Sequence, residues 1–473
     1  MNEKCQVFTP ENYVRELLDS VGYTKNLYGK KILENSCGDG NILAAVVQRY
    51  IDDCNAKGLS RTKIKNGLSR DIYGVEIDSI QYEKCIQKLN MILKHNNIKN
   101  VEWKIYNEDY LRWSEKIDFQ YIVGNPPYIT YSDLNQKEQN YVKETFSTCK
   151  KGKFDYCYAF IEKSILSLSK EGKMAYLIPS SIFKTVFGLD LRNFMKQYIT
   201  EIKDYTKERV FNTALVKSAI MILECERLKA TLHYSDMTAK KQIEIPIEKL
   251  EDKWFFSKNI CNGIHRFGDF FKVSHVVATL LNEAYVLRDG TYFEVENGYL
   301  CKNHIIERDV VKETATPRSL RYNKHEKIIF PYTYQKGKLV KFEQEQFEQM
   351  YPGAAAYLNE YKAKLNARKS DKNVKWFEYG RSQALNSLNC EKLLLSTVIT
   401  ENVEVYSLKE DCIPYAGMYI VQNENNTNTG YTLDYAIKVL KSDEFKNYVL
   451  KVGIPISGNS VRITSKDVED FKF

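Results

Sequence analysis

The amino-acid sequence predicts an α/β protein with a Rossmann-like N-terminal domain, followed by a mixed α+β domain. Three observations predict it. Short apolar runs alternate with helix-like segments in the first half. A glycine-containing turn joins the first apolar run to a helix-like stretch. From about residue 229 the alternation gives way to mixed polar and aromatic sequence, and we place the domain boundary so that the domains are residues 1–262 and 263–473.

Composition bounds the class of protein. The chain has 473 residues, of which 43% are hydrophobic, and a mean hydropathy of −0.45, so it is long enough for two cores and too polar for a membrane protein. No long apolar run follows Met1, and we therefore expect no secretory signal and a cytoplasmic location. The net charge of +8 favours an approach to phosphates without requiring it.

Cysteine and histidine usage speaks against a metal site. The 11 cysteines include no CxxC pair, and the 6 histidines are dispersed with no HExxH motif. No serine has an obvious Cys/His partner for nucleophilic catalysis. We expect free thiols in a reducing compartment, no metal and no covalent intermediate.

The first predicted strand, Lys30–Leu33, ends at Glu34 and leads into a turn with Gly38 and Gly40, and residues 42–47 follow as a helix. These three parts form the first unit of a nucleotide-binding sheet, because glycine lets the backbone approach a ligand closely. The turn lacks the GxGxxG spacing and a Lys-Ser/Thr phosphate clamp. It therefore favours an adenosine ligand without phosphates over NAD or ATP.

The next apolar run, residues 72–75, ends at Glu76. An acid at this point can accept hydrogen bonds from both hydroxyls of a ribose. The alternative is a solvated acid at a strand end. The polar stretch before it, residues 52–71, has the character of an insertion after the first helix.

A third strand, residues 101–105, precedes Asp109 and Tyr110. Asp109 is placed to accept a hydrogen bond from an adenine amino group, while Tyr110 packs against the ring. Ligands of open α/β sheets bind beyond the carboxyl ends of the strands. Ligand-type residues at successive strand ends therefore predict one binding site.

Close to the N-terminus, Thr9 is a predicted helix N-cap, with Pro10 at the first helical position and Glu11 in the first turn. The start of a helix favours anions, so this one suits the carboxylate end of a methionine-like ligand. The alternative is a capped helix without a ligand.

The fourth strand end carries Asn125, Pro126, Pro127 and Tyr128, after an apolar run and Gly124. The Asn125 side-chain carbonyl and the Pro126 backbone carbonyl can accept both hydrogens of an exocyclic amino group, while Tyr128 stacks on the heterocycle that carries it. The pattern predicts amino-group methylation. The alternative is a proline-rich turn that ends a strand.

Taken together, these motifs resemble those of gamma-class (TaqI-type) DNA N6-adenine methyltransferases in order and in chemistry. The segments that carry the resemblance are Phe8–Pro10, Asn35–Gly40, Val75–Glu76, Asp109–Tyr110, Asn125–Tyr128, Phe154–Glu162, Gly172–Pro179 and Val210–Asn212. The chain has Asn35 where many members of that family carry proline. The resemblance is detailed as far as about Glu226.

The resemblance implies a class I S-adenosylmethionine-dependent methyltransferase domain, followed by a target-recognition domain. It implies transfer of a methyl group from S-adenosylmethionine to a flipped-out adenine in double-stranded DNA. The implied cofactor residues are Thr9, Glu34, Gly38, Gly40, Glu76, Asp109 and Tyr110. Asn125, Pro126, Pro127 and Tyr128 form the implied catalytic tetrapeptide, and Tyr128 and Phe211 the two faces that hold the base. A separately encoded restriction endonuclease is a partner that the resemblance leaves open.

Beyond Glu226 the resemblance is weaker and rests on residues 330–332, 376–381 and 458–462. The densest basic and aromatic stretch of this half, residues 361–376, includes Lys364, Arg368 and Lys369. We expect these three side chains to contact DNA phosphates. The alternative is a solvated helix face.

Rival functions share parts of the pattern. Asn-Pro-Pro-Tyr is also found in enzymes that methylate a protein glutamine or a guanine amino group in RNA, which are typically compact and would leave the C-terminal half unexplained. A fused nuclease is not expected, because the residues before Phe8 are too few to form one. A DNA-binding module with an inactive methyltransferase fold is disfavoured by the intact Asn125 and Tyr128.

Overall fold

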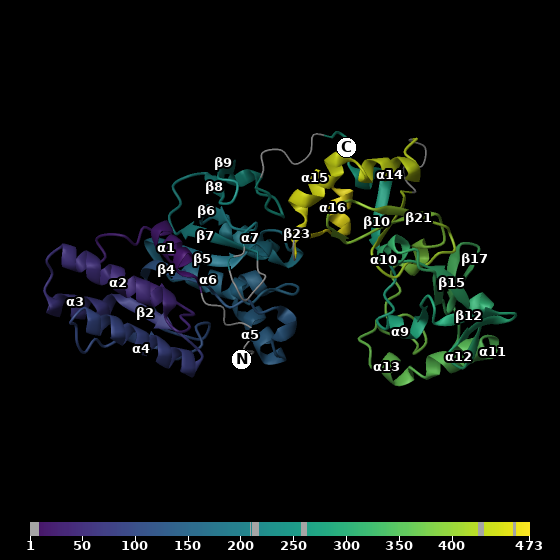
Figure 1. Cartoon of the computed structure of the whole chain (residues 1–473), viewed down its shortest axis with the longest axis horizontal. Helices are drawn as coiled ribbons and strands as arrows, with labels where there is room; N and C mark the ends of the chain where they lie inside the picture. The colour runs from purple at the N-terminus through teal and green to yellow at the C-terminus, as the bar shows by residue number, and fades with distance from the viewer. Residues whose placement is uncertain (1–8, 209, 211–216, 257–262, 424–429, 457–459) are drawn as a thin grey trace. The chain divides into compact units, whose positions relative to one another are not determined.

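The chain forms two compact units, Met1–Lys258 and Asn259–Phe473, each of which contains its own elements (Figure 1). The structure is a computed structural model of the whole chain and describes residues 9–208, 210, 217–256, 263–423, 430–456 and 460–473. The sequence places the boundary after residue 262, whereas contacts divide the chain after Lys258.

A single sheet organises the N-terminal unit. Within the described residues it contains nine strands in the order β3-β2-β1-β4-β5-β7-β6-β8-β9. The strands are β1 (Ile32–Glu34), β2 (Ile72–Val75), β3 (Lys104–Tyr106), β4 (Phe119–Gly124), β5 (Leu168–Pro179), β6 (Ile199–Asp204), β7 (Ser218–Glu224), β8 (Thr231–Asp236) and β9 (Lys241–Pro246).

Strand direction identifies the fold of this unit. Strands β3, β2, β1, β4 and β5 run parallel to one another, and β7 lies antiparallel between β5 and β6. This order, with one reversed strand, is that of the class I methyltransferase sheet, so the predicted fold class is confirmed. Strands β8 and β9 extend the sheet beyond β6.

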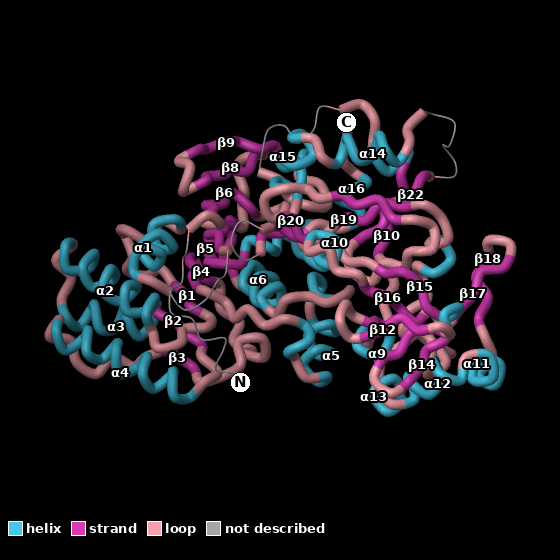
Figure 2. Tube along the Cα trace, turned by 45° about the vertical axis from the view of Figure 1, so that its right-hand side comes forward, coloured by secondary structure: helices cyan, strands magenta, loops and turns pink. Residues whose placement is uncertain are grey.

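Helices cover both faces of the sheet (Figures 1 and 2). They are α1 (Glu11–Ser20), α2 (Asn41–Ala56), α3 (Arg61–Asp71), α4 (Ser79–His95), α5 (Gln136–Thr145), α6 (Cys157–Leu166) and α7 (Leu189–Met195). Successive strand side chains point to opposite faces, so Ile32 and Ile72 join the core under α1–α4, while Leu33 and Tyr73 join the core under α5–α7. The apolar runs of the sequence are continuous because both faces are buried.

The structure adds to one local prediction and corrects another. The stretch taken as an insertion contains α3, which Ser60 caps and which buries Ile64 and Leu68; this apolar pair at i, i+4 is the helical signal within a polar segment. Helix α1 begins at Glu11 with Pro10 at the N-cap position and has no side-chain cap. Thr9 therefore lies outside the helix.

The C-terminal unit is mixed α+β, as predicted, with small antiparallel sheets. Within the described residues the pairing orders are β10-β22-β19-β21, β11-β16-β15, β12-β13-β14, β17-β18 and β20-β24-β23. The strands are β10 (Phe271–His275), β11 (Val286–Leu287), β12 (Tyr292–Val295), β13 (Gly298–Cys301), β14 (His304–Glu307), β15 (Val311–Thr314), β16 (Glu326–Ile329), β17 (Tyr332–Gln335), β18 (Lys338–Lys341), β19 (Lys392–Leu395), β20 (Val398–Ile399), β21 (Val405–Leu408), β22 (Met418–Gln422), β23 (Ile454–Pro455) and β24 (Val461–Arg462).

Short helices connect these sheets. They are α8 (Phe267–Phe270), α9 (Asn282–Tyr285), α10 (Pro317–Arg321), α11 (Gln344–Met350), α12 (Pro352–Asn359), α13 (Lys362–Asn366), α14 (Leu433–Leu440), α15 (Asp443–Val452) and α16 (Ser465–Glu469). The beginning and end of the unit lie together, because Arg266 bonds to Asp470 at 2.8 Å and the Phe473 amide donates to the His265 carbonyl at 3.0 Å. In the described part of the chain, no helix is long and apolar enough to cross a membrane.

Candidate active site

The carboxyl ends of four neighbouring strands form the candidate site. Strands β3, β2, β1 and β4 are adjacent and parallel, so the residues that follow them meet at one edge of the sheet. Glu34 ends β1, Glu76 follows β2, Asp109 follows β3 and Asn125 follows β4. The structure therefore brings the motifs to one edge although they are far apart in sequence.

The turn between β1 and α2 needs its glycines for two different reasons. Gly38 and Gly40 have φ of +51° and +84°, a backbone region that other residues adopt at a cost. A Cβ at Gly40 would lie 2.7 Å from Cys85 Sγ on α4, whereas no heavy atom lies within 4 Å of a Cβ at Gly38. Gly40 permits close packing, and Gly38 borders open space.

Two glutamates hold this turn, Glu34 buried and Glu76 half-buried. Glu34 accepts a hydrogen bond from the Leu43 amide in the first turn of α2 at 3.0 Å. Glu76 accepts from the amides of Gly38 and Asp78, each at 2.8 Å. Burial raises the pKa of Glu34 well above its ordinary value and also raises that of Glu76. Both carboxylates thus fix the backbone around the space next to Gly38.

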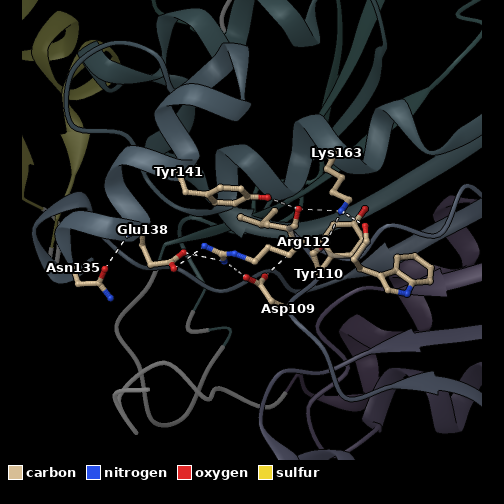
Figure 3. A network of polar contacts seen from close by, with 9 residues as sticks. Asp109, Tyr110, Arg112, Asn135, Glu138, Tyr141 and Lys163 are labelled. Carbon is tan, nitrogen blue, oxygen red and sulfur yellow. Dashed lines mark hydrogen bonds and ion pairs between the residues drawn. The ribbon is translucent and has the colours of Figure 1, made fainter.

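Asp109 belongs to an ion-pair network that the sequence did not indicate (Figure 3). Its carboxylate accepts from the Leu111 amide at 2.9 Å and pairs with Arg112. The same guanidinium donates to Glu138 on α5 at 2.8 Å and lies 4.0 Å from the centroid of the Tyr141 ring. Arg112 therefore connects the end of β3 to the helix that follows the Asn-Pro-Pro-Tyr loop.

Tyr110 lies in the core. Its ring is 2% exposed and packs on Phe160 with centroids 5.3 Å apart, while its hydroxyl lies 3.1 Å from Ser164 Oγ. Lys163 donates to the carbonyls of Tyr110 and Trp113, each at 2.6 Å, and burial lowers the pKa of this lysine to about 8. Since Lys163 belongs to α6, this helix fixes the backbone of the segment that follows β3.

A buried polar cluster lies behind the tetrapeptide. The Asn35 amide nitrogen donates to Ser164 Oγ at 2.8 Å and also bonds to the Tyr176 hydroxyl. Ser164 Oγ lies 2.7 Å from that hydroxyl. Since a proline at position 35 could not donate from a side chain, Asn35 introduces a polar connection between the ends of β1 and β5.

The Asn125 side chain is held on both sides. Its Nδ2 donates to Thr9 Oγ1 at 3.3 Å, and its Oδ1 accepts from the Tyr128 hydroxyl at 2.5 Å. That hydroxyl also lies 2.8 Å from the Leu177 carbonyl oxygen. The hydroxyl of Ser36 donates to the Asn125 backbone carbonyl at 3.2 Å. These contacts fix the direction of the amide, with Oδ1 on the tyrosine side.

The rest of the tetrapeptide is packed more tightly: Pro126 is buried and Pro127 is half-buried. The backbones of Thr130 and Asp155 form an isolated antiparallel β-bridge just before α6. Burial raises the pKa of Asp155 to about 6, although its carboxylate accepts from the Cys157 amide at 3.1 Å. Phe211, the predicted second face for the base, lies outside the described residues.

The basic residues predicted to contact DNA differ in their surroundings. The Arg368 guanidinium donates to the carbonyls of Thr279 at 2.6 Å and Glu378 at 3.0 Å, so it joins separate segments of the C-terminal unit. Lys364 is exposed and pairs with Glu283 at 2.8 Å. Lys369 is exposed. A phosphate would have to compete with internal carbonyls for Arg368.

No group of three or more histidine, cysteine or acidic side chains capable of holding a metal ion is found among the described residues.

Comparison with known proteins shows what the chain around this site is similar to. Residues 26–211 match the family model "Eco57I restriction-modification methylase". The chain is 25% identical over 379 residues to the Type II restriction enzyme and methyltransferase RM.Eco57I of Escherichia coli, a match that covers 68% of this chain and 37% of the relative. It is 29% identical over 201 residues to the Type II methyltransferase M.BstVI of Geobacillus stearothermophilus, with coverage of 40% and 36%.

Among solved structures, the fold is similar to that of the Type IIL restriction-modification enzyme MmeI in complex with DNA, with a TM-score of 0.62, 13% identity and coverage of 98% of this chain and 67% of that one. The matches to the two curated relatives span 37% and 36% of their lengths. The match to the Eco57I restriction-modification methylase model covers residues 26–211, which is less than half of the chain.

Proposed function

We propose that this protein is a site-specific DNA adenine-N6 methyltransferase that uses S-adenosylmethionine. The observation that carries the proposal is the fixed amide of Asn125, held by Thr9 and Tyr128 at the carboxyl end of β4. The family match supports methylation, and the relatives that carry the word methyltransferase in their names support it further.

The residues around Gly38 fit the proposed methyl donor. Open space adjoins Gly38, and Glu76 stands at the neighbouring strand end with lone pairs beyond those that accept from Gly38 and Asp78. We assign the ribose hydroxyls to Glu76 and the adenine amino group to Asp109. Glu34 acts through the turn, because its carboxylate caps α2, and Tyr110 acts through its backbone. S-adenosylmethionine supplies an electrophilic methyl group on a sulfonium.

Asn125 and Pro126 supply the groups that prepare the target nitrogen. The N6 lone pair of adenine is delocalised into the ring, which makes it a poor nucleophile. Hydrogen bonds from its two protons to Asn125 Oδ1 and the Pro126 carbonyl favour a tetrahedral nitrogen and stabilise the positive charge that develops there. No strong base is needed, because the proton can leave to water afterwards.

Tyr128 has two tasks in this proposal. Before the base enters, its hydroxyl occupies Asn125 Oδ1; on entry, the amino group replaces it, and the hydroxyl keeps the Leu177 carbonyl. The ring stacks on the adenine, which must leave the duplex to reach the site, and recovers part of the few kcal/mol lost on unstacking. Phe211 is assigned to the other face from the sequence pattern alone.

We propose double-stranded DNA as the partner and the cytoplasm as the location. MmeI, whose fold is similar, is described in complex with DNA. Restriction-modification enzymes pair methylation with cleavage, so a separately encoded endonuclease is a second proposed partner. The C-terminal unit is assigned to recognition of the DNA site.

Transfer of labelled methyl groups tests the proposal. The full chain is incubated with labelled S-adenosylmethionine and with DNA, RNA or protein extracts, and modified adenines in the DNA are mapped. Label in DNA adenine is the expected result. Label in RNA or in a protein glutamine would support the rival amino-group methyltransferases instead.

Asn125→Ala is the first variant to assay. We expect transfer to fall by about 100-fold or more, since a group that stabilises the transition state is lost, with cofactor affinity kept. Asn55→Ala, an exposed asparagine in the last turn of α2, is the matched control. Full turnover by Asn125→Ala would contradict the assignment.

A further inference from the structure

A groove of about 570 Å³ opens in the C-terminal unit, between α10 and residues 396–404. Helix α10 forms one wall with Arg318 and Arg321, and the facing wall includes Thr400 and Asn402. The two segments lie side by side in Figure 2, where α10 is next to β20. No predicted site residue lines this groove.

The wall formed by α10 is basic because the way this helix is capped leaves its two arginines on the exposed side. Thr316 and Ser319 form a capping box and are buried, which turns Arg318 and Arg321 outward, where both are exposed. Tyr322 follows and is 63% exposed. Residues 317–325 contain no acid, so this wall is a cationic surface with an exposed aromatic ring at its end.

The facing wall carries hydrogen-bonding groups of a different kind. Strand β20 pairs with β24 and places residues 400–404 at its end. Glu404 accepts from the Tyr406 hydroxyl at 2.6 Å and lies 3.9 Å from Arg321. Glu401 and Asn402 are exposed, and Asn402 Oδ1 accepts a long hydrogen bond of 3.4 Å from Lys446. Water can replace such a contact, so this amide is available to a ligand.

The combination of the two walls fits the edges of base pairs. Arginine donates to guanine O6 and N7, asparagine pairs with adenine N6 and N7, and glutamate accepts from cytosine N4. An acidic side chain would repel a phosphate, yet it suits the amino group of a base. We infer that this groove reads base edges of DNA, with Arg318, Arg321 and Asn402 as specificity residues; the inference rests on the proposed function.

Selection from a random DNA library tests this inference with the full chain. Arg321→Ala and Asn402→Ala should each relax the recognised sequence at one position and weaken preference there by roughly 10- to 100-fold. Affinity for S-adenosylmethionine should stay unchanged in both variants. A variant that is misfolded would bind the cofactor more weakly, so this measurement separates a loss of specificity from a loss of structure. Arg308→Ala, an exposed arginine in the same unit that pairs with Glu294, is the control and should keep the full site.

Lys324→Ala provides a second arm. This exposed lysine continues the basic wall, so its loss should weaken binding to all sequences alike and reduce the salt dependence by about one charge. If Arg321→Ala melts early, the exposed Asn402→Ala variant alone decides.

The outcomes separate the two proposals. Groove variants that methylate the wild-type site at the wild-type rate would overturn the groove inference and leave the proposed function standing, with another partner for this surface. A wild-type chain that neither binds nor methylates DNA would overturn both.

Discussion

At the scale of single residues, the tyrosine hydroxyl of the tetrapeptide has a role that its ring does not reveal. Thr9 accepts a hydrogen bond from the amide nitrogen of Asn125, and Tyr128 donates one to its amide oxygen. Burial raises the pKa of Tyr128 well above its ordinary value. The hydroxyl is therefore a neutral donor across the physiological range. In the proposed reaction, it keeps Oδ1 in place until the amino group of the target base replaces it.

Tyr128→Phe separates stacking from positioning. The variant keeps the ring and loses one hydrogen bond, worth about 1 kcal/mol, so we expect kcat to fall by roughly 5-fold while the KM for DNA changes little. Tyr128→Ala, which also loses the ring, should raise the KM for DNA. Steady-state kinetics of the two variants side by side would show it. A Tyr128→Phe protein with the wild-type kcat would argue that the hydroxyl does nothing for Asn125, whereas equal defects in both variants would argue that the ring does nothing for the base.

Asp155 gives a pH prediction. Burial raises its pKa to about 6, so between its unfolded value near 4 and about 6 the folded chain binds more protons than the unfolded one, and stability falls as pH rises through this range. Asp155→Asn removes the titratable carboxyl group and keeps a side-chain acceptor for the Cys157 amide.

From about pH 5 to about pH 7, the wild type should lose about 1 to 1.5 kcal/mol of unfolding free energy relative to Asp155→Asn. Urea denaturation of both proteins across this range measures the difference. A constant difference would mean that Asp155 titrates normally.

At the scale of elements, α5 is tied to the segment after β3 by Arg112 and by Tyr141, whose hydroxyl donates to the Leu111 carbonyl at 2.8 Å (Figure 3). Arg112 pairs with Asp109, assigned to the cofactor, and with Glu138 on α5. These are partly exposed pairs, each worth up to about 1 kcal/mol. The arrangement connects the proposed cofactor end of the site with the helix next to the target-base loop.

Arg112→Gln should therefore change two measured quantities, each by a few-fold: cofactor affinity and the KM for DNA. Glu138→Gln breaks the α5 side alone and should change mainly the KM for DNA. Calorimetric titration with S-adenosylmethionine and kinetics on DNA test the pair. An Arg112→Gln protein with both constants unaltered would leave the network without a function in the site.

At the scale of the whole molecule, the sheet of the N-terminal unit extends past the last recognised motif. The motifs end before Glu226, but β8 pairs with β6 beyond that point. Trp254 is fully buried, and its ring stacks on Phe183 with centroids 5.9 Å apart. A chain cut at Glu226 would expose the edge of β6 and remove this packing.

We expect a chain that ends at Lys258 to fold and bind S-adenosylmethionine but to lose site-selective DNA methylation. A chain that ends at Glu226 should aggregate or melt earlier, because an unpaired edge strand and a lost buried tryptophan each destabilise the unit. Thermal denaturation, cofactor titration and methylation mapping of both chains check this. Unchanged site selection without residues 259–473 would refute the assignment of the C-terminal unit.

The sequence alone determined the fold class and the order of the motifs, because both depend on local patterns. Apolar runs indicate buried strands, and glycines indicate turns. Because the strands are parallel, the residues that follow them, such as Glu76 and Asn125, lie at the same edge of the sheet. The roles of the side chains were harder to predict, since a residue type does not say which partner it meets. Arg368 is basic in sequence, yet it donates to internal carbonyls.

The long-range contacts are visible in the tertiary structure but not in the sequence. Thr9 meets Asn125 across 116 positions, Arg112 meets Glu138 from another element, and the groove at α10 joins segments that are separated along the chain. No local pattern encodes such pairs, because they arise from the packing of whole elements. The sequence gives the type of functional group at each strand end. The orientation of each donor and acceptor depends on the residues that pack around it.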